Sequence, residues 1–281
     1  MSNLGSIAKK ECVDLINSKI VLLGAAVLLL YVGVNLYEYH HALSSGLIKN
    51  IEFSSSVLSA MCTLTLYGSF FSVIIGFSSI ANEKKNHALN TLIVKPLYRD
   101  TIINGKLLGA CCFMSLVFGF ALLIYVSGLL MLSGEYISTF ILDFAAKIAF
   151  VYLLSLIYDL IFVTLSMTVA IIVDKQAIAL IISTLIVEMF DFIVGVNVTQ
   201  TISHIINSIM PVNMDAIEYF IVLLSPKGVI GLIINNSNIF SPIYGVCDVI
   251  GSLSSYVIRL CLYLFLSVIV CYMVFMRRDI V

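Results

Sequence analysis

The chain has 281 residues, of which 61% are hydrophobic and 11% charged, and its formal net charge is −1. A soluble domain carries charge on about a quarter of its residues, so this composition excludes a soluble globular protein. A mean hydropathy of +1.11 indicates instead that the lipid bilayer is its solvent. The net charge says nothing about nucleic acid, but no basic tail or acidic run is present, and nucleic acid is not among the expected partners.

In the first twenty residues, apolar side chains recur at roughly helical spacing among charged ones. This pattern predicts an amphipathic helix that lies on the inner membrane face before the first span. An unstructured polar leader is the alternative. No small-residue cleavage site follows the first apolar run, so we do not expect a cleavable signal. The apolar positions are Leu4, Ile7, Cys12, Leu15 and Ile16, and the charged positions are Lys9, Lys10, Glu11 and Asp14.

Six apolar segments are long enough to cross a bilayer, since a span needs roughly 20 apolar residues. We therefore predict an all-α membrane protein that forms a single transmembrane domain over residues 1–281. Only the turn 174–176 separates the fourth segment from the fifth, so these two are expected to be antiparallel neighbours. The spans are expected at about residues 20–37, 57–80, 104–132, 144–173, 177–195 and 252–276.

The distribution of lysine and arginine predicts the orientation, because cytoplasmic loops carry an excess of both. With the amino terminus inside, eleven of these residues are cytoplasmic and three lie in outer loops. We therefore expect a multi-pass protein of the cell (plasma) membrane with both termini in the cytoplasm. The eleven are Lys9, Lys10, Lys19, Lys84, Lys85, Lys95, Arg99, Lys106, Lys175, Arg277 and Arg278, and the three are Lys49, Lys147 and Lys227.

The region from 196 to 251 is apolar in places but is interrupted by Pro211, Pro226 and Pro242. Treating part of it as a seventh span would place Lys227 at mid-membrane, at a cost of about 2.5–3.5 kcal/mol. It would also move the carboxyl-terminal arginines outside. We expect instead short helices in this last outer loop, packed on the outer face and partly re-entrant, where protein or water satisfies the backbone.

A polar break at residues 82–106 separates the second span from the third. Asn82 is a residue type that caps helices, and Glu83 suits the positive end of a helix dipole. An apolar stripe follows and Pro96 cannot continue a helix, so the break predicts a short amphipathic helix in the cytoplasm. A solvated loop that only supplies positive charge is the alternative. The stripe consists of Ala88, Leu89, Leu92 and Ile93, and Arg99, Asp100, Gly105 and Lys106 follow Pro96.

At this break the chain resembles the permease subunits of ABC transporters of the type-2 (ABC-2) class. Between their second and third spans these carry a Glu, a Leu-rich short helix, a Pro, an Arg and then Gly-Lys. The opening IAKKECVDLINSK and the ending FMRRDIV are also similar to the family's ends. One departure is His87-Ala88, where a Gly-Thr pair is common. The matching residues are Glu83, Leu89, Leu92, Pro96, Arg99, Gly105 and Lys106.

The resemblance implies a coupling helix that sits in a groove of a separate ATP-binding-cassette subunit. Its apolar side chains fill the groove and its polar ones set the register at the rim. Gly105-Lys106 lacks the preceding Gly of a P-loop, so ATP and magnesium are expected in the partner and no cofactor in this chain. The groove-filling residues are Leu89, Leu92 and Ile93, and the rim residues are Glu83, Lys84, Lys85 and His87.

The family also implies the working unit. One chain with six spans is expected to form half of a pathway, in a homodimer or in a heterodimer with a second permease, surrounded by membrane lipid. Transport is expected to be export by alternating access, driven by the ATP-binding subunits.

Apart from Lys106 and Lys147 near the span ends, four charged residues fall inside the predicted spans, where such residues are costly and mark functional sites by default. Glu188 and Arg259 lie at similar depth by residue counting, which predicts an ion pair between the fifth and sixth spans. Asp159 has no cation at its depth. It is either a polar contact along the pathway or at the dimer seam, or a packed carboxyl that is hydrogen-bonded or protonated. The fourth residue is Asp191.

No residue pattern predicts catalysis or a metal site. The seven cysteines form no CxxC pair, and neither HExxH nor GxSxG occurs. Glu38, His40 and His41 cluster after the first span, but adjacent histidines are poor geometry for a closed metal site. The alternatives to a permease are an intramembrane enzyme that uses Asp159 or Glu188, and a membrane scaffold without transport.

Overall fold

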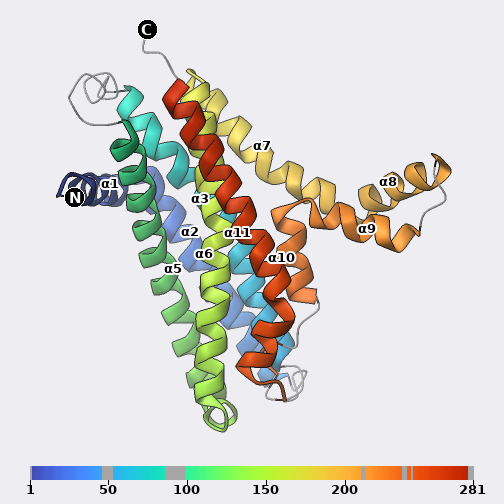
Figure 1. The fold of residues 1–281 in the computed structure, drawn as a ribbon. Coiled ribbons are helices and arrows are strands. Elements are labelled where there is room, and N and C mark those ends of the chain that lie inside the picture. Colours follow the sequence, from blue (N-terminus) through green and yellow to red (C-terminus); the bar gives the residue numbers. More distant parts are fainter. Residues whose placement is uncertain are drawn as a thin grey trace.

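The computed structural model describes residues 2–45, 53–85, 99–209, 213–235, 239–241 and 243–277. Within these ranges the chain is helical and forms no strand, which confirms the predicted all-α class. Most of the helices form one elongated bundle (Figure 1). They are α1 (Ser2–Asn17), α2 (Lys19–Ser44), α3 (Phe53–Lys85), α5 (Arg99–Ser138), α6 (Ile141–Ile172), α7 (Gln176–Val194), α8 (Val196–Ile209), α9 (Met214–Leu223), α10 (Pro226–Asn235) and α11 (Val246–Arg277).

Six of the described helices are long and apolar enough to cross a membrane, in agreement with the six predicted segments, and the bent pair of α9 and α10 would add a seventh if it is one span. They are α2, α3, α5, α6, α7 and α11. α5 has 40 residues, but Ser133 has non-helical backbone angles (φ −137°, ψ 28°), so the helix is kinked there. The kink directly follows the predicted end of the third span at 132. At its other end α5 begins at Arg99, before the predicted start at 104, because no proline lies between these positions.

α6 lies at the centre of the bundle and contacts α3, α5, α7 and α11. Its contact with α3, called the α3–α6 seam below, is close because small residues line it. A Cβ atom on Gly76 would lie 2.3 Å from the Val163 carbonyl oxygen, so no larger residue fits there. Polar groups also cross the seam: the Thr65 and Ser155 hydroxyls lie 2.7 Å apart, and Ser166 donates to a backbone carbonyl of α3. Small residues and hydroxyls are typical of helix contacts in membranes.

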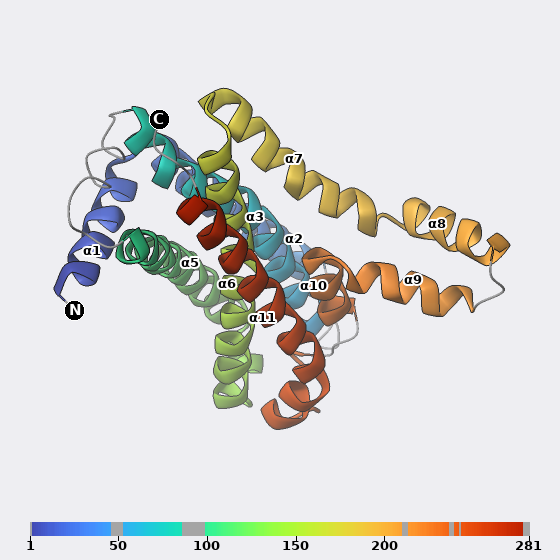
Figure 2. The same ribbon diagram turned by 45° about the horizontal axis from the view of Figure 1, so that its top comes forward.

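α3 ends, α5 begins and α6 turns into α7 at the same end of the bundle, which is the upper end in Figure 1. α1 lies across the bundle near this end and packs on α5 (Figure 2). The predicted amino-terminal helix therefore forms, and its position on the membrane surface stays a prediction. Lys9 and Lys10 are exposed, whereas Glu11 belongs to the buried side with Ala8 and Leu15.

The region 196–251 contains three short helices, as predicted. α8 and α9 pack on each other outside the bundle in both views (Figures 1 and 2). α9 and α10 meet at a bend of 111°, so the pair is either one broken span or a re-entrant loop. Ser225 stabilises the bend because its hydroxyl accepts the Gly228 N–H at 2.9 Å, and Tyr263 of α11 donates to the Leu223 carbonyl at 2.5 Å. α10 contacts both α7 and α11.

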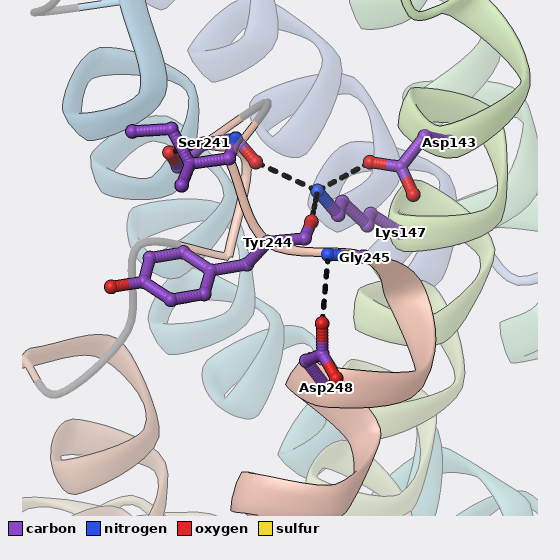
Figure 3. A network of polar contacts seen from close by, with 7 residues as sticks. Asp143, Lys147, Ser241, Tyr244, Gly245 and Asp248 are labelled. Carbon is purple, nitrogen blue, oxygen red and sulfur yellow. Dashed lines mark hydrogen bonds and ion pairs between the residues drawn. The ribbon is translucent and has the colours of Figure 1, made fainter.

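Lys147 does not lie in an outer loop, as the orientation argument assumed, but in the second turn of α6. Its side chain is 1% exposed and its ammonium lies 2.5 Å from the Asp143 carboxylate. The ammonium also donates to the Ser241 and Tyr244 carbonyls at 2.8 and 2.7 Å (Figure 3). Asp248 accepts the N–H of Gly245 in the same turn. Lys147 therefore ties the segment before α11 to the start of α6 at the lower end of the bundle.

We predict that Lys147→Met destabilises the folded protein by about 2–3 kcal/mol, because two buried carbonyls and Asp143 lose a charged donor. The midpoint of thermal unfolding, followed by far-UV circular dichroism in detergent, should fall. Lys175→Met, which removes an exposed lysine, is the matched control. Equal midpoints for the two variants would contradict the assignment.

Candidate functional site

The predicted coupling segment is described only at its two ends. His87, Leu89, Leu92, Ile93 and Pro96 fall in 86–98, outside the described residues. α3 continues through residues 82–85, so Asn82 is not the cap of a new helix as predicted. Nothing in 82–85 breaks a helix, and polar residues are tolerated where a helix leaves the membrane. Glu83 and Lys85 thus belong to the last turn of α3, and Arg99 is the first residue of α5.

Lys84 holds the end of α3 against the turn between α6 and α7. Its ammonium donates to the Val173 and Ile171 carbonyls at 2.8 and 3.2 Å and lies 3.5 Å from the Asp174 carboxylate. These carbonyls form the negative end of the α6 dipole, where a cation is favourable. Gln176 completes the contact by donating from its amide to the Ala81 carbonyl at 3.0 Å. We call this set the α3 clamp.

Lys106 holds the start of α5 against α1 and α3. Its ammonium donates to the Glu11 carboxylate and to the Ser79 carbonyl, both at 2.8 Å. The Lys106 and Glu11 side chains are only 1% and 6% exposed. A charge buried this deeply is stable only when it is paired and hydrogen-bonded. We call this set the α5 clamp.

Two glycines of α5 bring α1 close enough for this ion pair. A Cβ atom on Gly105 would lie 2.6 Å from Ile7, and one on Gly109 would lie 2.7 Å from the Ala8 carbonyl oxygen. Both glycines face α1 because they are one helical turn apart. Burial, and to a lesser degree the Cys112 thiol, raises the pKa of the Cys12 thiol in the same contact.

The structure thus gives internal partners to residues that the sequence assigned to a docking surface. Lys84 contacts the end of α6, and α1 packs against Gly105 and Lys106. Sequence reasoning missed Glu11, Gln176 and Gly109 as parts of the site. Glycines spaced four apart in an apolar segment and opposite charges flanking two spans were the signals that could have indicated the α5 clamp.

The charges of the fifth and sixth spans pair differently from the prediction. In the described part of the chain, Glu188 and Arg259 form no ion pair, because α10 contacts both helices that carry them. Lys227 of α10 pairs with Asp191 instead and also interacts electrostatically with Glu188. Arg259 interacts electrostatically with two tyrosines, Tyr219 and Tyr263. Lys227 is 21% exposed, so the predicted outer-loop lysine is largely packed among helices.

Asp159 is completely buried near the middle of α6. Neither carboxyl oxygen has a hydrogen-bond partner. The carboxyl lies against Gly68 of α3, where a Cβ atom would lie 2.7 Å from Oδ2 and 2.3 Å from the ring of Phe118. The structure therefore places Asp159 inside one protomer, between α3, α5 and α6. Among the described residues, no three His, Cys, Asp or Glu side chains gather as metal ligands.

An apolar groove of about 550 Å³ lies between α2 and α3. Tyr31 and Tyr67 line it, with ring centroids 4.3 Å apart. Its other lining residues are apolar, so the groove offers little chemistry that would select a particular substrate. They are Leu23, Gly24, Val27, Leu28, Leu30, Val34, Phe70, Phe71 and Ile74.

We predict that Lys106→Met loosens α1 by about 3–5 kcal/mol, because it leaves the buried Glu11 carboxylate without its partner. Gly109→Leu should loosen α1 by about 1–3 kcal/mol, because it fills the space that α1 needs. The open fraction of α1 should therefore rise at least about fivefold in each variant. Trypsin cleavage after Lys9 and Lys10 measures this opening.

Gly5→Leu is the matched control, since a side chain at Gly5 meets no atom within 4 Å. Cleavage of Gly109→Leu at the rate of this control would rule out the proposed docking of α1.

The sequence pattern described as "ABC-2 family transporter protein" matches residues 6–280. The match therefore includes nearly all of α1, both clamps and the whole bundle. No curated protein matches the chain with significant similarity. A family match that spans an all-helical chain with six apolar helices identifies it at the level of the family. The chain belongs to the ABC-2 transporter family, as a multi-pass membrane permease component.

Proposed function

We propose that this chain is the permease subunit of an ATP-driven exporter and that residues 86–98 receive the movement of a separate ATP-binding-cassette subunit. The observation that carries the proposal is the pair of clamps on either side of that segment. The α3 clamp joins its incoming end to the α6–α7 turn. The α5 clamp joins its outgoing end to α1 and α3.

When the partner displaces residues 86–98, the two clamps transmit that displacement to two separate groups of helices. A displacement of the segment reaches α6 and α7 through Lys84, and α1 through Lys106. Packed helices respond to such a displacement as rigid bodies that shear or rotate. Alternating access then follows when this movement opens one side of the pathway and closes the other.

The ATP-binding partner supplies ATP and magnesium. In the segment, Leu89, Leu92 and Ile93 fill the partner's groove, and His87 stands at its rim where the family commonly has a small pair. The Lys84 ammonium already binds within the α3 clamp. Glu83, Lys85 and His87 are therefore the residues that contact the rim of the partner's groove.

The working unit is a dimer of this chain, or of this chain with a second permease, in the cell membrane with both termini in the cytoplasm. The excess of lysine and arginine at one side of the spans supports this orientation. It places the upper end of the bundle, with both clamps, on the side where ATP is available.

The proposal is tested by co-purification of this chain with a co-expressed ATP-binding-cassette subunit. Leu89→Asp with Leu92→Asp should lower the amount of bound ATPase at least about tenfold, equivalent to 1.4 kcal/mol, because the groove contact loses its apolar side chains. Leu142→Asp with Ile243→Asp, at two highly exposed residues of the lower end, is the matched control. Retention of the ATPase by the segment variant would refute the proposal.

The transmitting role of the α3 clamp predicts a different result. Lys84→Met should keep the ATPase bound, yet lower the stimulation of its activity by the permease roughly fivefold or more, because the push no longer reaches α6. Activity of the purified complex measures the effect, with Lys175→Met as the control. Full stimulation in Lys84→Met would show that the clamp does not transmit movement.

A further inference from the structure

Among the described residues, two side chains have buried polar atoms without a hydrogen-bond partner, the Ser79 hydroxyl and the Asp159 carboxyl, and Asp159 is the ionisable one. It lies halfway along α6, deep in the α3–α6 seam, and both of its oxygens are buried without a hydrogen-bond partner. No lysine, arginine or histidine of the described residues forms an ion pair with it. The backbone of Gly68 from α3 lies against its carboxyl, and the Phe118 ring from α5 approaches the same position. Tyr158, beside it on α6, is the titratable group that interacts with it electrostatically.

An ionised carboxylate at this position would have neither water nor a cation nor a donor to stabilise it. Charged groups in such surroundings become neutral by changing their protonation state. The same burial therefore favours a carboxyl group that carries a proton. Glu11, which is nearly as buried, differs because Lys106 donates to it at 2.8 Å.

The packing around Asp159 also decides which cation fits. A Cβ atom on Gly68 would already be 2.3 Å from Phe118 and 2.7 Å from Asp159. A bound metal ion needs several oxygen ligands and room for them, and a water molecule needs its own volume. The close approach of Gly68 and the Phe118 ring leaves little room for either on that side of the carboxyl. A proton requires no added volume and is the ligand that the closed seam can accept.

Three hydroxyls of the seam need no such ligand, because carbonyls of their own helices accept their hydrogen bonds. Thr65 donates to the Met61 carbonyl at 2.9 Å, Ser72 to the Gly68 carbonyl at 2.8 Å, and Thr164 to the Ile161 carbonyl at 2.8 Å. These three hydroxyls keep a partner when α3 and α6 separate. Separation would break the Thr65–Ser155 and Ser166–Val73 contacts that cross the seam, and it would let the Asp159 carboxyl gain water and ionise.

We propose that Asp159 is a proton-binding site that holds its proton while α3 and α6 are packed together and releases it when the seam opens. The first half of this inference stands on the geometry alone. The second half rests on the proposed function, in which the α3 clamp keeps the upper ends of α3 and α6 joined while the rest of the seam opens. Each opening then releases a proton and each closure takes one up.

Infrared spectroscopy of the full chain in lipid nanodiscs tests the first half. The wild-type spectrum minus that of Asp159→Asn should contain the carbonyl stretch of a protonated carboxylic acid, unchanged from mildly acidic to mildly alkaline pH. Asp14→Asn, which changes an exposed aspartate of α1, should give no such band in the same subtraction. Absence of the band from the Asp159 difference spectrum overturns the proposal.

Thermal unfolding gives a second measurement that does not depend on one spectrum. The folded chain keeps the proton of Asp159, whereas the unfolded chain releases it to water above the ordinary range of a carboxyl. The folding equilibrium constant of the wild type should therefore fall about tenfold per pH unit relative to Asp159→Asn as pH rises through neutrality. Parallel pH profiles for the two proteins overturn the proposal.

The release step is tested in the complex with the ATP-binding subunit. Addition of ATP should weaken the Asp159 band and release about one proton per permease chain into a lightly buffered dye solution. A bound, active ATPase with an unchanged band overturns the release step while the proposed function stands. An ATPase that does not bind refutes the proposed function and leaves the band of the isolated chain as evidence for the proton.

Discussion

The buried ion pair between Lys106 and Glu11 fixes the arrangement of the two helix ends that flank residues 86–98. Lys106 lies on α5, Glu11 on α1, and the same ammonium reaches the Ser79 carbonyl on α3. In a medium that excludes water, neither charge is stable without the other. Three helices must therefore meet at one point, and the chain on both sides of residues 86–98 is positioned by that meeting.

The other buried charges obey the same constraint in different ways. Lys84 and Lys147 are satisfied mainly by backbone carbonyls near the ends of helices, and Lys227 by a carboxylate of α7. Each lysine ties together segments that are far apart in the sequence. Asp159 differs from all of them because it has no donor, so its charge must be removed rather than paired.

The sequence predicted what depends on local composition and left open what depends on distant contacts. Hydropathy alone predicts six apolar helices and the turn between the fourth and the fifth. Counting depth along each span failed for Glu188 and Arg259, because α10 enters between their helices from a loop region. The Gly105-Lys106 motif was visible, but its partner Glu11 is 95 residues away, and no local pattern indicates a contact at that separation.

The same separation sets an order for biogenesis. α1 is synthesised first, yet its docking surface on α5 does not exist until Gly105 and Gly109 have been made. The contact closes a loop of about one hundred residues. The loss of chain entropy on closure opposes the contact until the ion pair has formed and stabilises it. During that interval Glu11 remains in water, where an ionised carboxylate is solvated and needs no partner. Docking of α1 therefore marks a late stage of membrane insertion, because α1 can dock only after the first two spans and the start of the third have entered the membrane.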